Sequence, residues 1–199
     1  MLCVTNKQTS KPDVLRNYLT THPTQENYKC TIWEGVSATA AAPIYFKRVK
    51  FKDQTEWVDG GYAPNRNNPV HEAMAELSRE QAFENKDIGC LLSIGTGVPS
   101  INAVSDNLLP FLRKSVDMLN DSEGIANEFE KSERGKKLEA SNQYFRFSVP
   151  QGMQDLNLDD YRETAKMKAL TDLYLQSVGT GRGVQQCAQI LFKPDENSQ

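Results

Sequence analysis

The chain has 199 residues, which is enough for one ordinary domain with a hydrophobic core, although its mean hydropathy of -0.60 is on the polar side. Its formal net charge is -3, so it lacks the basic surface that a nucleic-acid-binding protein usually carries. No apolar run approaches the roughly 18 to 20 residues that a membrane-spanning helix requires. We therefore expect no nucleic-acid partner and no transmembrane segment.

The cysteines and histidines are few and scattered. No C-x-x-C pair occurs, and only His22 and His71 are available as imidazole ligands, so we expect no structural zinc, no other metal and no cofactor. The N-terminus has no apolar stretch long enough for a signal peptide. We expect reduced, mostly buried thiols and a cytoplasmic location, or a membrane surface reached from the cytoplasm. The four thiols belong to Cys3, Cys30, Cys90 and Cys187.

The first third of the chain predicts strands around one helix. Apolar residues 2–4 followed by the polar run 5–11 indicate a strand end and a loop. Because a domain rarely begins in the middle of a strand, we expect the natural domain to start earlier than this chain. Residues 14–19 predict another strand. Residues 28–42 have apolar positions close to helical spacing, and Pro43 should end that helix because the residue before a proline avoids the helical region.

Residues 56–59 predict a strand that runs into two glycines. Asn68 and Pro69 then predict the start of a helix, with Asn68 as N-cap and Pro69 at the first helical position. We expect the buried face of that helix to consist of Val70, Ala73, Met74 and Leu77.

Residues 88–94 are almost continuously apolar, which is typical of a buried strand in a covered sheet, and the run ends in Gly95-Thr96-Gly97. Residues 108–138 begin with a helical pattern and continue as a charge-dense stretch from 121 to 137. Residues 144–149 predict a strand, and 158–175 and 184–191 predict helices. This alternation indicates an α/β fold with a mostly parallel sheet sandwiched by helices. We interpret 1–199 as one domain, incomplete at its N-terminus.

Asp59-Gly60-Gly61 is the most informative stretch. A carboxylate at the end of a strand lies at the sheet edge where open α/β folds place their sites. The two glycines leave room for a partner group to approach closely. A tight turn with a solvated aspartate is the alternative interpretation of these three residues alone.

The surrounding motifs distinguish the two interpretations. Residues 33–46 read W-E-G-V-S-A-T-A-A-A-P-I-Y-F, residues 67–69 read N-N-P, and residues 91–97 read L-L-S-I-G-T-G. In this order, and with D-G-G between them, the motifs resemble the patatin-like phospholipase family of lipid acyl hydrolases. The resemblance is to the C-terminal portion of the family's domain, in a fungal-type form, and is strongest over residues 3–97.

The resemblance implies an α/β sandwich carrying a serine–aspartate dyad. In that family the aspartate accepts the hydroxyl proton of a serine in a G-x-S-x-G elbow, and the serine attacks the ester carbon of a lipid. A glycine-rich loop supplies the oxyanion hole. Carried onto this sequence, Asp59 matches the dyad aspartate, and Gly60 and Gly61 complete its motif.

The nucleophile and the oxyanion loop are absent from the sequence. The family order puts both before the region that matches Cys3. Gly35-Val36-Ser37-Ala38-Thr39 resembles the elbow, but its fifth position is Thr39 and it falls within the predicted helix, so Ser37 is interpreted as a packing residue. Ser93 is interpreted as a serine of a buried strand. We therefore expect no nucleophile in this chain.

Three further patterns have open interpretations. Residues 62–66 separate Gly61 from Asn67, where relatives commonly have a shorter loop. The basic cluster of Lys47, Arg48, Lys50 and Lys52 is either an exposed strand face or a contact with anionic lipid head groups near the site. The pattern Gly179-Thr180-Gly181-Arg182-Gly183 predicts a helix stop followed by a new helix.

The sequence leaves more than one function open. The first is a lipid or phospholipid acyl hydrolase of which this chain holds the aspartate but lacks the serine, and which we expect to be inactive alone. The second is a catalytically inactive relative that binds a lipid or a protein. A more distant third is a nucleotide-binding module built on the two glycine loops.

Overall fold

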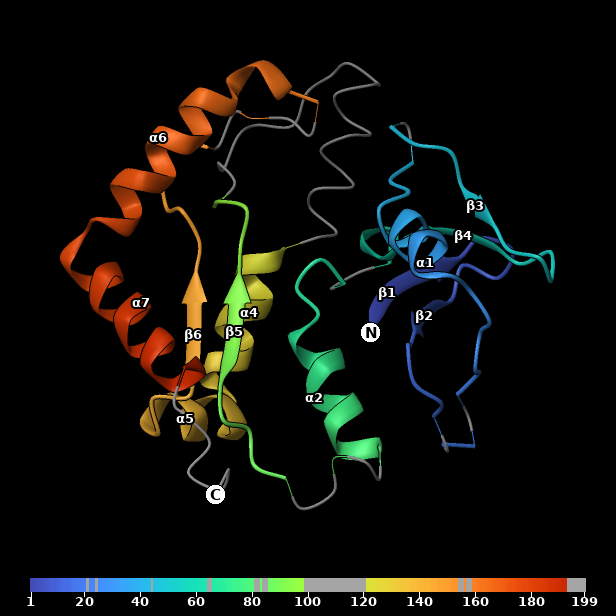
Figure 1. Cartoon of the computed structure of the whole chain (residues 1–199), viewed down its shortest axis with the longest axis horizontal. Helices are drawn as coiled ribbons and strands as arrows, with labels where there is room; N and C mark the ends of the chain where they lie inside the picture. The colour runs from blue at the N-terminus through green and yellow to red at the C-terminus, as the bar shows by residue number, and fades with distance from the viewer. Residues whose placement is uncertain are drawn as a thin grey trace. The chain divides into compact units, whose positions relative to one another are not determined.

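The computed structural model describes residues 1–20, 22–23, 25–43, 45–63, 66–80, 83, 86–98, 121–153, 156 and 159–192. The chain forms two compact units (Figure 1). Unit 1 consists of Met1–Asn85 and Ala103–Ile125, and unit 2 of Lys86–Asn102 and Ala126–Gln199. The single domain expected over 1–199 stays a prediction. The helical pattern expected between residues 108 and 120 lies outside the described residues.

Unit 1 contains a four-stranded sheet in the order β2-β1-β4-β3. The strands are β1 (Leu2–Asn6), β2 (Pro12–Leu15), β3 (Val49–Lys50) and β4 (Glu56–Asp59). All three pairings are antiparallel, so the expectation of a mostly parallel sheet is wrong for this unit. The reason is local, because short turns join β1 to β2 and β3 to β4, and strands joined in this way must run in opposite directions.

Both turns are closed by side chains that the sequence contains. The Asn6 side chain accepts hydrogen bonds from the backbone N–H groups of Gln8 and Thr9 at 2.9 and 3.0 Å. In the second turn the Asp53 carboxylate accepts from the N–H of Thr55 at 2.9 Å. Asparagine and aspartate favour turns because they can bond the backbone one to three residues further on.

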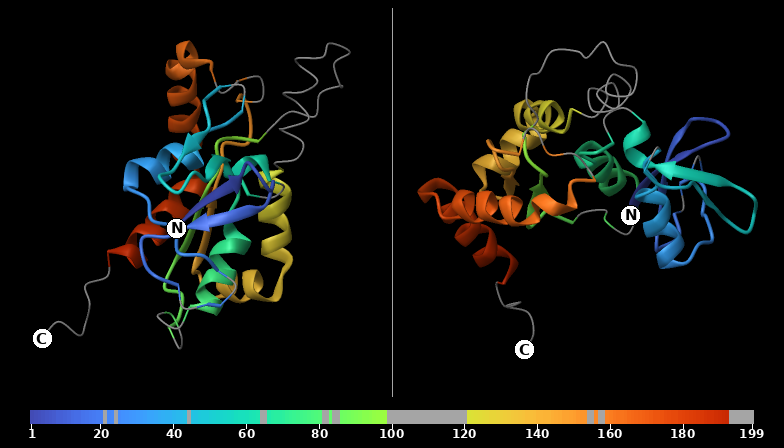
Figure 2. Two further views of the ribbon diagram at one scale, coloured as in Figure 1. Left: turned by 90° about the vertical axis from the view of Figure 1, so that its right-hand side faces the viewer. Right: turned by 90° about the horizontal axis from the view of Figure 1, so that it is seen from above.

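Helix α1 (Ile32–Thr39) contacts β1 and β4 in unit 1 (Figures 1 and 2). It is shorter than the helix expected over 28–42 because Thr31 and Glu34 form a capping box that fixes its start. Its buried side, which includes Ala38, joins the core of the sheet. That core consists of Val4, Leu15, Ala38, Phe51 and Trp57.

A 3₁₀ turn, η1 (Gly60–Tyr62), follows β4, and helix α2 (Val70–Arg79) follows after a loop. The predicted start of α2 is wrong by one residue, because Pro69 itself is the N-cap. The Asn68 side chain still accepts a hydrogen bond from the N–H of Val70 at 3.4 Å. Of the predicted buried face, Val70 and Met74 are buried, while Ala73 and Leu77 are partly exposed.

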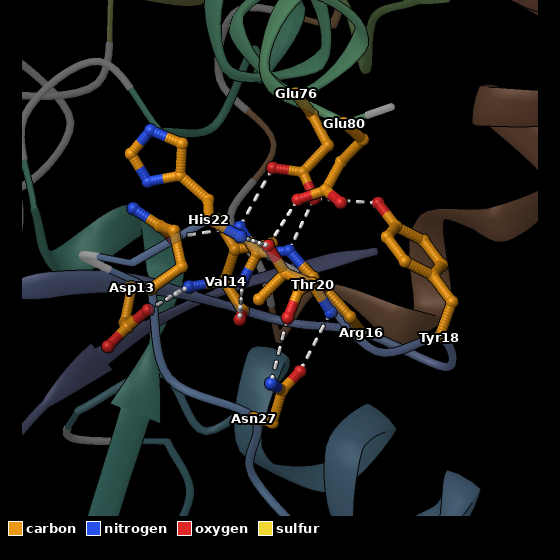
Figure 3. Close-up of polar contacts among 10 residues, drawn as sticks. Asp13, Val14, Arg16, Tyr18, Thr20, His22, Asn27, Glu76 and Glu80 are labelled. Atoms are coloured by element: carbon orange, nitrogen blue, oxygen red, sulfur yellow. Dashed lines mark hydrogen bonds and ion pairs between the residues drawn. The ribbon is translucent and has the colours of Figure 1, made fainter. Parts of the chain in front are cut away.

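A buried polar network connects α2 to the segment after β2 (Figure 3). The Arg16 guanidinium forms an ion pair with Glu76, and the two side chains are only 3% and 5% exposed. The Tyr18 hydroxyl donates to Glu76 at 2.7 Å, and the Thr20 hydroxyl donates to the buried Glu80. Since a buried charge without its partner is costly, this network fixes where α2 lies in unit 1.

Unit 2 is built on the parallel pair β5 (Leu91–Ile94) and β6 (Tyr144–Phe147). The parallel pairing expected from the sequence is found here alone among the described strands. Figure 2 shows helices on both sides of this pair. Helix α4 (Ser122–Lys131) belongs to unit 1 up to Ile125 and to unit 2 from Ala126. The other helical elements of unit 2 are α5 (Glu133–Ala140), η3 (Tyr161–Glu163), α6 (Thr164–Leu175) and α7 (Val178–Leu191).

Two predictions in unit 2 are wrong. Residues 88–94 were expected to form a fully buried strand, but β5 alternates and exposes 72% of Ile94. The glycine pattern 179–183 was expected to separate two helices, but it lies inside α7. Ser177 is the N-cap of α7, so the helix begins before these glycines and continues through them. None of the described helices is long and apolar enough to cross a membrane.

Candidate functional site

Asp59 is the last residue of β4, and it lies opposite Val4 of β1 in the sheet register. Its N–H donates to the carbonyl oxygen of Ala41 at 3.1 Å, which ties the end of the strand to the segment after α1. The strand predicted over Glu56–Asp59 is confirmed with the same boundaries. Asp59 is therefore held by the sheet on one side and by the end of the helical segment on the other.

The Asp59 carboxylate is partly buried, and its Oδ1 accepts a hydrogen bond from the N–H of Gly61 at 2.7 Å. Burial raises the pKa of Asp59 above its ordinary value, and the Gly61 N–H opposes this by a smaller amount. A carboxylate with a raised pKa binds a proton more readily than a solvated aspartate does, and this is the property required of a general base. The bond to Gly61 also leaves Oδ2 as the other proton-accepting oxygen.

Gly60 and Gly61 are both buried, and each lies close to atoms of a neighbouring segment. A Cβ added to Gly60 would lie 2.5 Å from the carbonyl oxygen of Cys3 in β1. A Cβ added to Gly61 would lie 2.2 Å from Oδ1 of Asn67. The D-G-G stretch can therefore pass directly against the backbone of β1 only because Gly60 lacks a side chain, whereas the obstacle at Gly61 is the movable Asn67 side chain.

A pocket of about 380 Å³ opens beside Asp59 within unit 1. Its wall combines the start of β1, the end of α1, the D-G-G stretch and the loop before α2. The Thr39 hydroxyl donates to the Cys3 carbonyl at 2.6 Å, which joins two parts of this wall. The lining residues are Met1, Leu2, Cys3, Thr39, Asp59, Gly60, Gly61, Arg66, Asn67 and Pro69.

Arg66 is the charged lining residue that the sequence analysis did not identify. It belongs to the loop between Gly61 and Asn67, and its guanidinium pairs with Glu72 of α2 at 3.0 Å. Its Nη1 is buried and has no hydrogen-bond partner among the described residues. The unusual length of this loop was the available signal, but loop length alone does not tell which side chain turns toward the pocket.

The two serines considered as nucleophiles do not line the pocket. Ser37 is within α1, as expected, and is partly buried there. Ser93 lies in β5 of unit 2, where its hydroxyl oxygen accepts a hydrogen bond from Arg146 at 3.0 Å. Among the described residues that line the pocket there is neither a serine nor a histidine.

The other patterns from the sequence do not join this pocket. In the basic cluster, Arg48 forms an ion pair with Glu56 at 2.7 Å, whereas Lys47, Lys50 and Lys52 are exposed. The described residues contain no group of three or more His, Cys, Asp or Glu side chains that could hold a metal ion. The nucleotide-binding alternative loses one of its two glycine loops, because 179–183 is helical.

Comparison with known protein families supports the resemblance seen in the motifs. The family model described as Patatin-like phospholipase matches residues 4–74, which is a little over a third of the chain. The matched region includes α1, Asp59-Gly60-Gly61 and the first half of α2, and it ends before the S-I-G-T-G stretch. No curated protein matches the chain. The predicted resemblance is thus confirmed over residues 4–74, whereas its fungal type and its place in the C-terminal portion of the family's domain stay predictions.

Proposed function

We propose that this chain supplies the general base of a lipid acyl hydrolase that works through a serine–aspartate dyad, and that Asp59 is this base. The observation that carries the proposal is the position and the environment of the Asp59 carboxylate. It lines a pocket, it is oriented by the Gly61 N–H at 2.7 Å, and burial raises its pKa. It also lies within the region that matches the patatin-like phospholipase model.

In the proposed reaction Oδ2 of Asp59 accepts the proton of a serine hydroxyl while the serine oxygen attacks the ester carbon. Gly61 keeps Oδ1 occupied, so the carboxylate presents a single oxygen to the serine. The carbonyl oxygen of the ester becomes an oxyanion that backbone N–H groups must stabilise. The alcohol part of the lipid then leaves with a proton, and water releases the acyl group from the serine.

The serine and the oxyanion donors are assigned to polypeptide outside this sequence. The lining of the pocket supports that assignment, because the described residues next to Asp59 offer no hydroxyl other than Thr39, and Thr39 already donates to Cys3. We expect the 199-residue chain alone to hydrolyse no ester and to resist labelling by a fluorophosphonate. Labelling that is abolished by Asp59→Asn would show that a nucleophile within the chain had been missed.

The decisive experiment uses the reading frame directly upstream of Met1. We expect it to encode a glycine-rich loop and a G-x-S-x-G elbow. The protein extended by that segment should hydrolyse phospholipid esters, and Asp59→Asn should lower this activity strongly without changing the circular dichroism spectrum. Asp53→Asn is the matched control, because Asp53 lies in the exposed turn between β3 and β4 and contacts only that turn. An upstream frame without these motifs, or an Asp59→Asn enzyme that stays fully active, would contradict the proposal.

We also propose that unit 1 contacts an anionic membrane surface through α1. One face of α1 exposes Ile32, Trp33 and Val36 by 85%, 66% and 51%. The exposed lysines of the basic cluster follow in the next segment, and the charge of Lys52 acts on the carboxylate of Glu34 in α1. An exposed tryptophan beside lysines suits the interface of a bilayer with negative lipids.

Vesicle co-sedimentation tests this contact without any catalysis. The chain should bind vesicles that contain phosphatidylserine, and Trp33→Ala and Lys50→Glu should each weaken binding. Vesicles of phosphatidylcholine alone should bind less, because they lack the negative charge. Equal binding to both, or an unchanged Trp33→Ala variant, would exclude this surface and would favour a protein partner for α1.

A further inference from the structure

Two cysteines that are far apart in the sequence meet inside unit 2. The Sγ atoms of Cys90 and Cys187 are 3.9 Å apart, although 97 positions separate the residues. Cys90 directly precedes β5, and Cys187 lies in α7. Both thiols are free, and a disulfide bond requires a sulfur–sulfur distance of about 2.05 Å. We propose that Cys90 and Cys187 are a redox modification site that closes reversibly to an intramolecular disulfide.

The surroundings favour a disulfide over a metal site. Two thiolates do not complete the four-ligand shell of a structural zinc, and the described residues provide no cluster of three or more metal-binding side chains. The two sulfurs lie within sulfur hydrogen-bond distance of each other. Cys187 is only 4% exposed, whereas Cys90 is partly exposed, so an oxidant from solvent should react first with Cys90 and the buried Cys187 should then complete the disulfide.

The position of the pair gives the disulfide a structural consequence. Unit 2 is assembled from two separate stretches of chain, one of which carries β5 and the other β6 and α7. In the reduced protein these stretches are joined through the parallel pairing of β5 with β6, and α7 contacts β6. A bond between Cys90 and Cys187 would link the two stretches covalently and would therefore lock unit 2 in its assembled form.

The reaction with glutathione disulfide balances without any other reagent. The Cys90 thiolate attacks one glutathione sulfur, which breaks the glutathione disulfide and releases the first glutathione thiolate. The Cys187 thiolate then attacks the sulfur of Cys90 and releases the second. The two cysteines lose two electrons and two protons, and one glutathione disulfide becomes two molecules of glutathione.

The rate should depend strongly on pH. Burial, together with the neighbouring Cys187 thiol, raises the pKa of Cys90 to about 11. The thiolate is the attacking species, and well below the pKa its fraction grows tenfold for each pH unit. Disulfide formation should therefore be slow at neutral pH and about 30-fold faster at pH 8.5 than at pH 7.0.

Peptide mass spectrometry under non-reducing conditions tests the proposal on the full 199-residue chain. After incubation with glutathione disulfide, digestion should yield one cross-linked peptide pair that contains Cys90 and Cys187 and lacks two hydrogen atoms. Dithiothreitol should restore the separate peptides. Cys187→Ser should abolish the cross-link, whereas Cys30→Ser, which changes a partly exposed thiol of unit 1, should leave it unchanged.

A second measurement distinguishes a site built by the fold from random oxidation. In concentrated guanidinium chloride the same treatment should scatter disulfides among all four cysteines. Folded protein should give the Cys90–Cys187 pair and show a higher Tm for unit 2 in the oxidised wild type than in Cys187→Ser. Mixed glutathione adducts without a cross-link, or an identical pattern with and without denaturant, would overturn the proposal. None of these outcomes depends on hydrolase activity.

Discussion

Replacement of Gly60 by alanine tests how tightly the D-G-G stretch is fitted against β1. The added Cβ would lie 2.5 Å from the carbonyl oxygen and 2.7 Å from the carbonyl carbon of Cys3. Both atoms belong to the backbone of β1, which is paired with β2 on one side and with β4 on the other. The contact can be relieved only if the strand or the η1 turn moves.

The size of the effect follows from the atoms involved. Overpacking a well-filled site usually costs about 1 to 3 kcal/mol, and a rigid backbone obstacle places Gly60→Ala at about 3 kcal/mol. Gly61→Ala meets Asn67 Oδ1 at 2.2 Å, but this atom is the end of an exposed side chain that can rotate away. We therefore expect Gly61→Ala to cost less than about 1 kcal/mol.

Urea unfolding followed by tryptophan fluorescence is the appropriate assay, because Trp57 is fully buried in the core of unit 1. Gly60→Ala should lower the unfolding midpoint far more than Gly61→Ala. Adding Asn67→Ala should restore the Gly61→Ala variant, whereas it should not help Gly60→Ala. If Gly60→Ala lost no more stability than Gly61→Ala, the close packing of the aspartate turn against β1 would be refuted.

Three other predictions concern the buried ion pair, the general base and α7. Glu76→Gln should lower the free energy of unfolding by about 3 kcal/mol at neutral pH, because it leaves a buried guanidinium without its counter-ion. The hydrogen bond from that guanidinium lowers the pKa of Glu76 below 4.5, so its stabilisation is complete above pH 4.5 and is lost as the pH falls through the folded-state pKa. Urea titrations of wild type and variant should converge in acid, while Lys7→Gln, which breaks an exposed pair, should change little at any pH. In the extended, active protein, Asp59→Asn should lower kcat/KM by about 100- to 10,000-fold. The acid limb of the wild-type pH–rate profile should lie above 3.8, because burial raises the pKa of Asp59, and a limb at or below 3.8 would contradict its role as the base. Gly181→Ala should stabilise unit 2 by about 0.5 to 1 kcal/mol in thermal melts, because Gly181 lies inside α7 and its Cβ would have only an ordinary contact, at 3.6 Å from the carbonyl oxygen of Leu175. Gly183→Ala should gain less, since its Cβ would lie 3.3 Å from the Phe147 ring, and a larger gain at that position would contradict the packing described here.

Local signals in the sequence predicted the site better than they predicted the sheet. The strand at Glu56–Asp59 and the turn that follows it were predictable, because a short β-prone run ends at two glycines. The start of α1 was also encoded locally: Thr31 and Glu34 have capping-box spacing, but the apolar pattern alone suggested an earlier start. The capping box decides where α1 starts, because it provides hydrogen-bond acceptors for the free backbone N–H groups of the first turn. The spacing of apolar residues carries no information about these groups.

Long-range features could not be predicted from the sequence. The alternation of strands and helices suggested a parallel sheet, yet whether two strands run parallel depends on the length and path of their connection. The 97-position separation of Cys90 and Cys187 gave no sign that their sulfurs would meet. The same holds for Arg66, whose place in the pocket wall depends on the tertiary structure around it. Such features arise from tertiary packing, which a single sequence does not display.

The start of β1 has a practical consequence for how the protein is handled. Met1, Leu2 and Cys3 form part of the wall around Asp59, so any polypeptide joined to Met1 emerges at the pocket itself. An N-terminal affinity tag would bring its own side chains, often histidines, next to the proposed base, and could obstruct the pocket or imitate a missing group. The same short path means that a segment encoded ahead of Met1 would begin its course within reach of Asp59.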